Sequence, residues 1–263
     1  MATLVTFHAH PDDECIACGG VMRAAADAGH RVVLVIATGG ELGEVLADPL
    51  APGETLAERR YAETLESARI LGAARTEFLG YLDSGMVDTP TNTADGAFAA
   101  ADVDEAAERL AVILREEDAD VLTIYDERGG YGHPDHVQVH HVGARAAEVA
   151  GTPRVYEATT NRDEMRRLLS LAREMGMGDG DGPSERDIES MGTPQERLTT
   201  RVDVTGWLDA KRAAMRAHAS QITPESFFLA LPDEAFAAVF GTEWFRRVGE
   251  PEGGPSFTTT LFA

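Results

Sequence analysis

Residues 4–38 read LVTFHAHPDDECIACGGVMRAAADAGHRVVLVIAT. Two runs in this stretch, LVTFHA and RVVLVIAT, are rich in aliphatic and β-branched residues and are typical of buried strands. The small residues of GGVMRAAADAG between them fit a helix, and Gly29 marks its end. A strand, a helix and a second strand in this order predict two parallel strands joined by a crossover helix.

The same alternation continues to about residue 160. Further strands are expected over RTEFLGY (75–81) and DVLTIYD (120–126). Helical patterns cover residues 54–73, 102–118 and 136–151. We therefore predict an α/β fold, in which a Rossmann-like and mainly parallel sheet carries helices on both faces.

The pattern becomes irregular from about residue 161. We expect one domain over residues 1–263, made of a Rossmann-like core (1–160) and a C-terminal elaboration (161–263). Within the elaboration, MGMGDGDGPSERDIES (175–190) is polar and rich in glycine, which predicts a flexible loop. Residues 207–222, WLDAKRAAMRAHASQI, again have a helical pattern.

The composition argues against two classes of partner. A formal net charge of -22 at pH 7 repels phosphate, so neither nucleic acid nor an anionic membrane surface is expected to bind. The longest aliphatic run, residues 32–37, is too short to be inserted across a bilayer. We find no signal peptide and no disulfide scaffold, and therefore expect a cytoplasmic protein. Homo-oligomer formation stays open.

Two proline-centred motifs carry the candidate chemistry, HPDD at residues 10–13 and HPDH at residues 133–136. Either motif alone would fit an ordinary turn, because Pro and Asp favour turns. Each follows a predicted strand, however, and the carboxyl ends of parallel strands share one edge of a sheet, so the two are expected to meet. His10 and Asp13 are spaced to lie on one side of a helical turn. One histidine of HPDH would complete three ligands for zinc and leave a fourth position for water.

The motifs AHPDDE and GGYGHPDH together resemble the LmbE-like, or N-acetylglucosaminyl-phosphatidylinositol de-N-acetylase, superfamily. The resemblance is strongest to its mycothiol-pathway deacetylase and mycothiol S-conjugate amidase branches. It runs from residue 4 to about residue 150 and recurs weakly in RAHASQI (216–222).

The resemblance implies a metal site and a set of catalytic residues. It implies that a zinc ion, or iron(II) in its place, is held by His10, Asp13 and His136. The implied catalytic residues are Asp12 as general base, His133 as oxyanion stabiliser or proton donor to the leaving amine, Asp135 as the group that orients His133 and keeps it protonated, and Tyr131 as a group that polarises the carbonyl.

Three further residues are candidates for binding a sugar. Glu41 lies in a glycine-rich loop, ATGGELGEV (37–45), that borders the sugar pocket in the family. By the same resemblance Asp83 would contact sugar hydroxyls, and Arg60 stands where relatives carry a substrate-binding arginine. Arg60 also fits a solvated helix charge, and both interpretations stay open.

We therefore expect a zinc-dependent hydrolase that removes the N-acetyl group from a small-molecule N-acetylglucosamine-type sugar conjugate. An amidase of the mycothiol S-conjugate type is the alternative within the same class. Ala17 replaces a polar residue of the mycothiol-pathway relatives, which leaves the substrate itself open. In another class, Cys15 and Cys18 could form a redox dithiol, although the neighbouring carboxylates would raise the pKa of both thiols.

Overall fold

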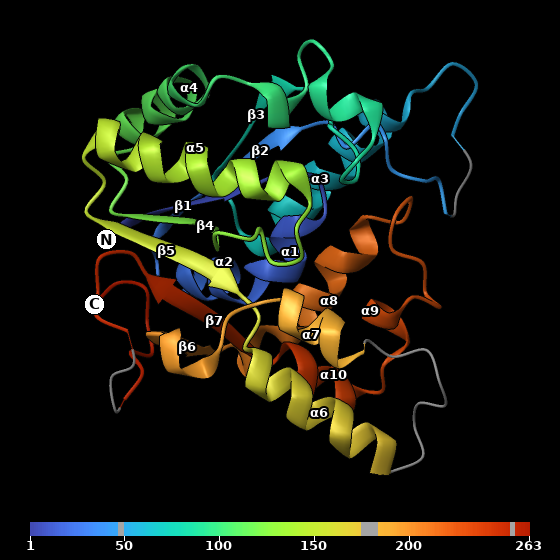
Figure 1. Cartoon of the computed structure of the whole chain (residues 1–263), viewed down its shortest axis with the longest axis vertical. Coiled ribbons are helices and arrows are strands. Elements are labelled where there is room, and N and C mark those ends of the chain that lie inside the picture. The colour runs from blue at the N-terminus through green and yellow to red at the C-terminus, as the bar shows by residue number, and fades with distance from the viewer. Residues whose placement is uncertain (47–49, 175–183, 253–255) are drawn as a thin grey trace.

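The computed structural model describes residues 1–46, 50–174, 184–252 and 256–263. A seven-stranded sheet crosses this part of the chain in the order β3-β2-β1-β4-β5-β7-β6 (Figure 1). The five parallel strands are β1 (Thr3–His8), β2 (Arg31–Thr38), β3 (Arg75–Tyr81), β4 (Val121–Tyr125) and β5 (Arg154–Thr159). β7 (Thr242–Arg247) pairs antiparallel with β5 and with β6 (Thr200–Asp203). The predicted Rossmann-like, mainly parallel sheet is confirmed.

Helices cover both faces of the sheet, as the sequence predicted (Figure 1). On one face lie α4 (Val103–Glu116) and α5 (Pro134–Ala150). The other face packs against α2 (Gly19–Asp27), α3 (Leu56–Leu71), α8 (Leu208–Ala217) and α10 (Asp233–Phe240). In β1, Leu4 belongs to one apolar cluster and Val5 to the other. Burial on both faces explains why these strands read as continuous apolar runs.

The remaining elements are short or lie in the C-terminal elaboration. They are α1 (Asp13–Ala17), α6 (Arg162–Glu174), α7 (Glu185–Ser190), α9 (Phe227–Ala230) and four 3-10 turns at Pro90–Thr93, Phe98–Ala100, Gln195–Arg197 and Thr205–Trp207. Within the described residues, no helix is both long enough and apolar enough to cross a bilayer.

Two segments of the elaboration differ from the sequence predictions. Of the expected flexible loop, residues 175–183 lie outside the described residues, while its last six residues form α7. Ser184 caps that helix and Asp187 returns the bond, a capping box that stabilises a helix start. The helix expected over 207–222 ends at Ala217. The single-domain organisation and the cytoplasmic location stay predictions.

A buried ion pair fastens the elaboration to the core. Lys211, the one lysine in the sequence, is 1% exposed on α8, and its Nζ lies 2.5 Å from Glu243 Oε1 on β7. The Glu243 carboxylate also accepts hydrogen bonds from the main-chain N–H groups of Gly20 (2.7 Å) and Val21 (2.9 Å), in the first turn of α2. One carboxylate thus joins α2, α8 and β7, and the positive end of the α2 dipole adds to its stabilisation.

Replacing Lys211 by methionine should destabilise the fold strongly. The variant leaves the Glu243 carboxylate buried without its cation, which typically costs about 3 to 5 kcal/mol in the free energy of unfolding. Urea denaturation followed by circular dichroism measures this cost. The control is Arg145→Met, which breaks an exposed pair with Asp104 and should leave the unfolding free energy nearly unchanged. Equal losses in the two variants would contradict the prediction.

Candidate metal centre

The two proline motifs meet because their strands are neighbours. β1 pairs in parallel with β4, so the segments that follow the two strands leave the same edge of the sheet. After β1 the chain turns at Pro11 into α1, and after β4 a glycine-rich loop leads into α5. His133 is the N-cap of α5 and Pro134 occupies its first turn, where the fixed φ of proline suits a helix start. This start places Asp135 and His136 in the first turn of α5, facing the HPDD corner.

Three ligand atoms converge at this point. Asp13 Oδ2 lies 3.5 Å from His10 Nδ1 and 3.3 Å from His136 Nε2. His10 Nδ1 and His136 Nε2 are themselves 3.3 Å apart. A tetrahedral zinc with ligand bonds of about 2.0 to 2.2 Å separates its ligand atoms by about 3.3 to 3.6 Å. The three residues predicted as ligands therefore have the spacing and the donor types that such a metal requires.

A second histidine of the HPDH motif also lies close. His10, His133 and His136 each offer a nitrogen within 4.8 Å of the others, so this set could hold a metal as well. The His133 ring is also engaged elsewhere, because its Nδ1 accepts the Asp135 main-chain N–H at 3.2 Å. His10 and His136 belong to both sets, and the closer spacing of the first set favours Asp13 over His133 as the remaining ligand.

The field at the site suits a cation. Burial alone would lower the pKa of His10, but hydrogen bonds with Asp13, Asp135 and Asp83 outweigh it and raise that pKa well above its usual value. Burial would raise the pKa of Asp13, yet the charge of His136 and the hydrogen bond from His10 lower it. These side chains thus stabilise positive charge between them, which is the condition that a bound metal cation needs.

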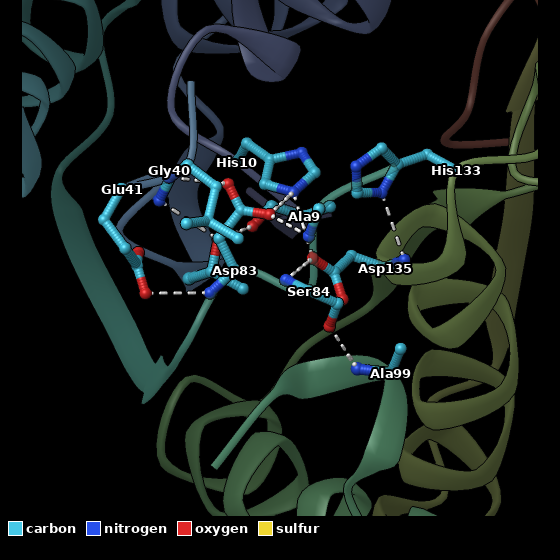
Figure 2. Close-up of polar contacts among 12 residues, drawn as sticks. Ala9, His10, Gly40, Glu41, Asp83, Ser84, Ala99, His133 and Asp135 are labelled. Carbon is cyan, nitrogen blue, oxygen red and sulfur yellow. Dashed lines mark hydrogen bonds and ion pairs between the residues drawn. The ribbon is translucent and has the colours of Figure 1, made fainter. Parts of the chain in front are cut away.

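Asp135 has a different partner from the one predicted. Its carboxylate accepts hydrogen bonds from the main-chain N–H (2.9 Å) and the hydroxyl of Ser84 and lies 3.1 Å from His10 Nε2 (Figure 2). Asp135 therefore orients His10 rather than His133, and a carboxylate behind an imidazole ligand is a common arrangement at metal sites. Burial, followed by the charges of His10 and His136, lowers the pKa of His133 to about 4. The lowered pKa favours the neutral ring, in contrast to the protonated His133 that the resemblance implies.

Asp12 and Arg60 form a pair next to the ligands. Burial raises the pKa of Asp12 to about 6, although the Arg60 guanidinium opposes this shift. Arg60 Nη2 lies 3.2 Å from Asp12 Oδ2 and donates to the Pro11 carbonyl at 2.5 Å, while Nη1 donates to the Gly40 carbonyl at 2.7 Å. Because Arg60 is only 4% exposed, the alternative of a solvated helix charge is wrong.

Asp83 and Glu41 are joined by a hydrogen bond next to His10. Glu41 Oε1 accepts the main-chain N–H of Asp83 at 2.9 Å, and the Asp83 carboxylate accepts those of Leu42 (3.3 Å) and Gly85 (2.8 Å) (Figure 2). Asp83 Oδ1 also lies 3.6 Å from His10 Nε2. The two predicted sugar contacts thus belong to the same cluster as the ligands.

Tyr131 is half exposed, with its hydroxyl 3.4 Å from His136 Nε2. Its position beside a ligand leaves the phenol free to meet a bound molecule. His8 is a buried, packed histidine, with Nδ1 hydrogen-bonded to the Tyr125 hydroxyl at 2.8 Å.

The two cysteines do not have the properties of a redox pair. Both thiols are free and fully buried, and burial raises the pKa of each. A reactive cysteine needs exposure and a lowered pKa. Cys15 and Cys18 are therefore packing residues of α1 and the start of α2.

Sequence reasoning missed Ser84 and Glu14. Ser84 carries no motif signal, and its role depends on a contact 51 residues away along the chain. Glu14 is the third carboxylate of PDDE, and its full burial at 0% exposed distinguishes it from a solvated turn residue. The loop glycine Gly129 was also missed. A Cβ there would lie 2.4 Å from His136 Cβ, and its φ is +61°.

Gly129→Ala should weaken binding of a divalent metal by about 10- to 100-fold, because the added methyl displaces the ligand His136. Titration with Co²⁺, followed by its visible absorption, measures the affinity. Gly130→Ala is the matched control, since φ is +76° there and no atom lies within 4 Å of the added Cβ. Both variants carry the strain of a left-handed alanine, so equal affinities would show that the contact with His136 is unimportant.

Comparison with known proteins agrees with this geometry. The family model described as GlcNAc-PI de-N-acetylase matches residues 5–147, just over half of the chain. A protein of Nocardiopsis dassonvillei, named 1D-myo-inositol 2-acetamido-2-deoxy-alpha-D-glucopyranoside deacetylase, is 40% identical, covering 93% of this chain and 93% of its own. The deacetylase 1 of the same name from Catenulispora acidiphila is 38% identical, covering 95% of this chain and 85% of its own.

Solved structures share the fold at lower identity. N,N'-diacetylchitobiose deacetylase from Pyrococcus horikoshii has a TM-score of 0.58 and 22% identity, covering 94% of this chain and 83% of its own. GalB, the 4-carboxy-2-hydroxymuconate hydratase of Pseudomonas putida KT2440, has a TM-score of 0.63 and 19% identity, covering 98% of this chain and 100% of its own. With the family model and the 38–40% identical relatives, the assignment is clear: the chain belongs to the GlcNAc-PI de-N-acetylase (PIG-L) family.

Proposed function

We propose that the chain is a zinc-dependent N-deacetylase that hydrolyses 1D-myo-inositol 2-acetamido-2-deoxy-α-D-glucopyranoside to acetate and the free amine. The single observation that carries the proposal is the convergence of His10, Asp13 and His136 at ligand spacing, with Asp12 directly before Asp13 in the chain. The substrate is taken from the printed names of relatives 38–40% identical over more than nine-tenths of the chain.

His10, Asp13 and His136 would hold the zinc ion. When bound, zinc lowers the pKa of a coordinated water to about 7 and polarises a carbonyl oxygen. Asp135 supports the site from behind, since its carboxylate faces the far nitrogen of the His10 ring and fixes which nitrogen points inward.

Asp12 is proposed to move the proton. It accepts a proton from the attacking water as the new C–O bond forms, and returns that proton to the amine nitrogen as the C–N bond breaks. A group that both takes and gives a proton works best with a pKa near the operating pH. The raised pKa of Asp12, about 6, supports this assignment. The Arg60 guanidinium holds the carboxylate in place at 3.2 Å.

His133 is proposed to stabilise the oxyanion as a neutral hydrogen-bond donor. Its Nδ1 accepts the main-chain N–H of Asp135, so in the neutral ring the proton is on Nε2. One well-placed donor to a developing oxyanion is worth about 10²- to 10³-fold in kcat. The Tyr131 hydroxyl is a candidate second donor to the carbonyl oxygen.

The sugar is proposed to lie against Asp83 and Glu41. Carboxylate oxygens accept hydrogen bonds from sugar hydroxyls, and the Asp83 carboxylate is held next to His10 by main-chain N–H groups. Arg60 is proposed to act mainly through Asp12, because two of its three nitrogens already bind protein oxygens. A cytoplasmic site of action is part of the proposal.

Asp12→Asn and His136→Ala should separate proton transfer from metal binding. Asp12→Asn keeps the side-chain shape and should retain about one zinc per chain, but kcat should fall by about 10²- to 10⁴-fold. His136→Ala removes a ligand and should lose zinc. Metal analysis and an assay of released amine give both quantities. Near-full activity in Asp12→Asn would show that another group is the base, and unchanged zinc in His136→Ala would show a different ligand set.

Cys18→Ser should leave deacetylation intact. The substitution breaks any dithiol while it preserves a small buried side chain, so a redox enzyme would lose its activity and a deacetylase would not.

The assay measures acetate released from the acetamido sugar and, in parallel, amine released from a mycothiol S-conjugate amide. Faster cleavage of the conjugate would favour the amidase alternative instead.

A further inference from the structure

The main chain of Asp12 is strained. Its φ is +95° and its ψ is −30°, outside the left-handed helical region that Asp residues sometimes occupy. The other non-glycine residues of positive φ in the described part of the chain are Asp88 (+66°) and Asp118 (+45°), both in exposed turns. A backbone of this kind costs free energy and persists only where its surroundings enforce it.

The neighbouring carboxylate of Glu14 binds this strained residue directly. Glu14 Oε2 accepts the main-chain N–H of Asp12 at 3.0 Å. A hydrogen bond from residue i to the side chain of residue i+2 fixes the orientation of the peptide plane that precedes Asp12. Arg60 holds the Asp12 carboxylate at 3.2 Å, so the two ends of the residue have separate anchors.

Two remote elements hold Glu14 in turn. Its Oε1 accepts a hydrogen bond from the Ser67 hydroxyl of α3 at 2.5 Å and lies 2.6 Å from His218 Nε2, just after α8. All three side chains are 0% exposed. With both a hydroxyl and an imidazole on Oε1, the Glu14 carboxylate is fixed in place while Oε2 faces Asp12.

Among the described residues, the His218 ring has one hydrogen-bond partner, Glu14. Its other ring nitrogen, Nδ1, is buried and has no partner among the described residues. A buried polar atom without a partner is rare and costs free energy. The backbone around it is fixed, because Ile222 N–H donates to the His218 carbonyl at 2.8 Å and Glu63 of α3 accepts both the N–H and the hydroxyl of Ser220.

We propose that Glu14, anchored by Ser67 and His218, is a positioning residue that holds the main chain of Asp12 in its strained conformation of positive φ and thereby aims its carboxylate at the metal centre. The inference rests on the proposed function of Asp12 as the base. Arg60 fixes the carboxylate, and Glu14 fixes the backbone that carries it. The RAHAS segment of the elaboration thus contributes to a site that no residue of that segment touches directly.

A matched control is built into the chain. Glu243 is also a buried carboxylate that accepts main-chain N–H groups and a cation, but it serves α2 and α8 rather than the HPDD corner. Glu14→Leu and Glu243→Leu therefore remove the same chemistry at the same depth. A purely structural role predicts the same result for both variants.

Crystal structures of the two variants give the decisive measurement, the φ angle of Asp12. In Glu14→Leu we expect Asp12 to relax to negative φ, and in Glu243→Leu to keep its positive φ. A positive φ at Asp12 in Glu14→Leu would overturn the proposal, whatever reaction the protein catalyses. If the wild-type protein released no acetate from the acetamido sugar, the proposed function would fail, and this angle would still decide the role of Glu14.

Kinetics supply the second measurement. Glu14→Leu should lower kcat by about 10- to 100-fold with KM nearly unchanged and zinc retained, as for other residues that support a site from behind. Glu243→Leu should lower Tm but leave kcat unchanged. An equal fall of kcat in the two variants would overturn the positioning role.

Variants of His218, which binds Glu14, test the proposal if Glu14→Leu fails to fold. His218→Gln places an amide N–H near the position of Nε2 and should retain most of kcat, whereas His218→Leu has no donor and should lose about 10-fold or more. Equal kcat values in these two variants would show that the hydrogen bond to Glu14 does not matter, and would overturn the proposal.

Discussion

Crowded negative charge is the constraint on which this site depends. The carboxylates of Asp13, Asp83 and Asp135 all lie close to the His10 ring, and Asp12 directly precedes Asp13 in the chain. Like charges this close raise one another's free energy, and burial removes the water that would screen them. The pairing of β1 with β4 forces the proximity, since the two motifs follow neighbouring parallel strands. Imidazoles, a guanidinium and main-chain N–H groups offset this repulsion, and a metal cation would offset it further.

The carboxylates differ because each has its own donors. Asp13 faces two imidazoles, which lower its pKa, whereas burial raises the pKa of Asp12 to about 6 despite Arg60. Adjacent groups with pKa values pushed in opposite directions are typical of sites where one holds charge and the other carries protons. Asp12 and Asp13 are neighbours in sequence, yet the strained turn at Asp12 points their carboxylates to different partners. The conformation of the backbone at Asp12 therefore gives the two neighbouring carboxylates different surroundings.

The sequence predicted what depends on local pattern. The strands β1 to β4 and the helices α2 to α5 follow from apolar periodicity, and the meeting of HPDD with HPDH follows from strand ends. What the sequence could not predict depends on contacts between distant residues. Asp135 faces His10 rather than its neighbour His133 because α5 turns its first residues toward β1, 125 positions away. The strand β5 was not recognised, and β7 lies in a segment where the apolar residues also fit helices.

The fold alone does not determine the chemistry, because a hydratase shares it with a TM-score of 0.63. The proposed chemistry depends on how the corner at Asp12 is held, and much of that support lies outside the residues that match the family model. That match ends at residue 147, whereas His218 supports Glu14, Ser220 is bound by Glu63, and Lys211 with Glu243 fastens α8 to the sheet. The C-terminal elaboration thus contributes, through His218 and Glu14, to the support of the HPDD corner. Relatives that keep the two motifs and change this segment would keep a metal site, and would differ in how well the base beside it is aimed.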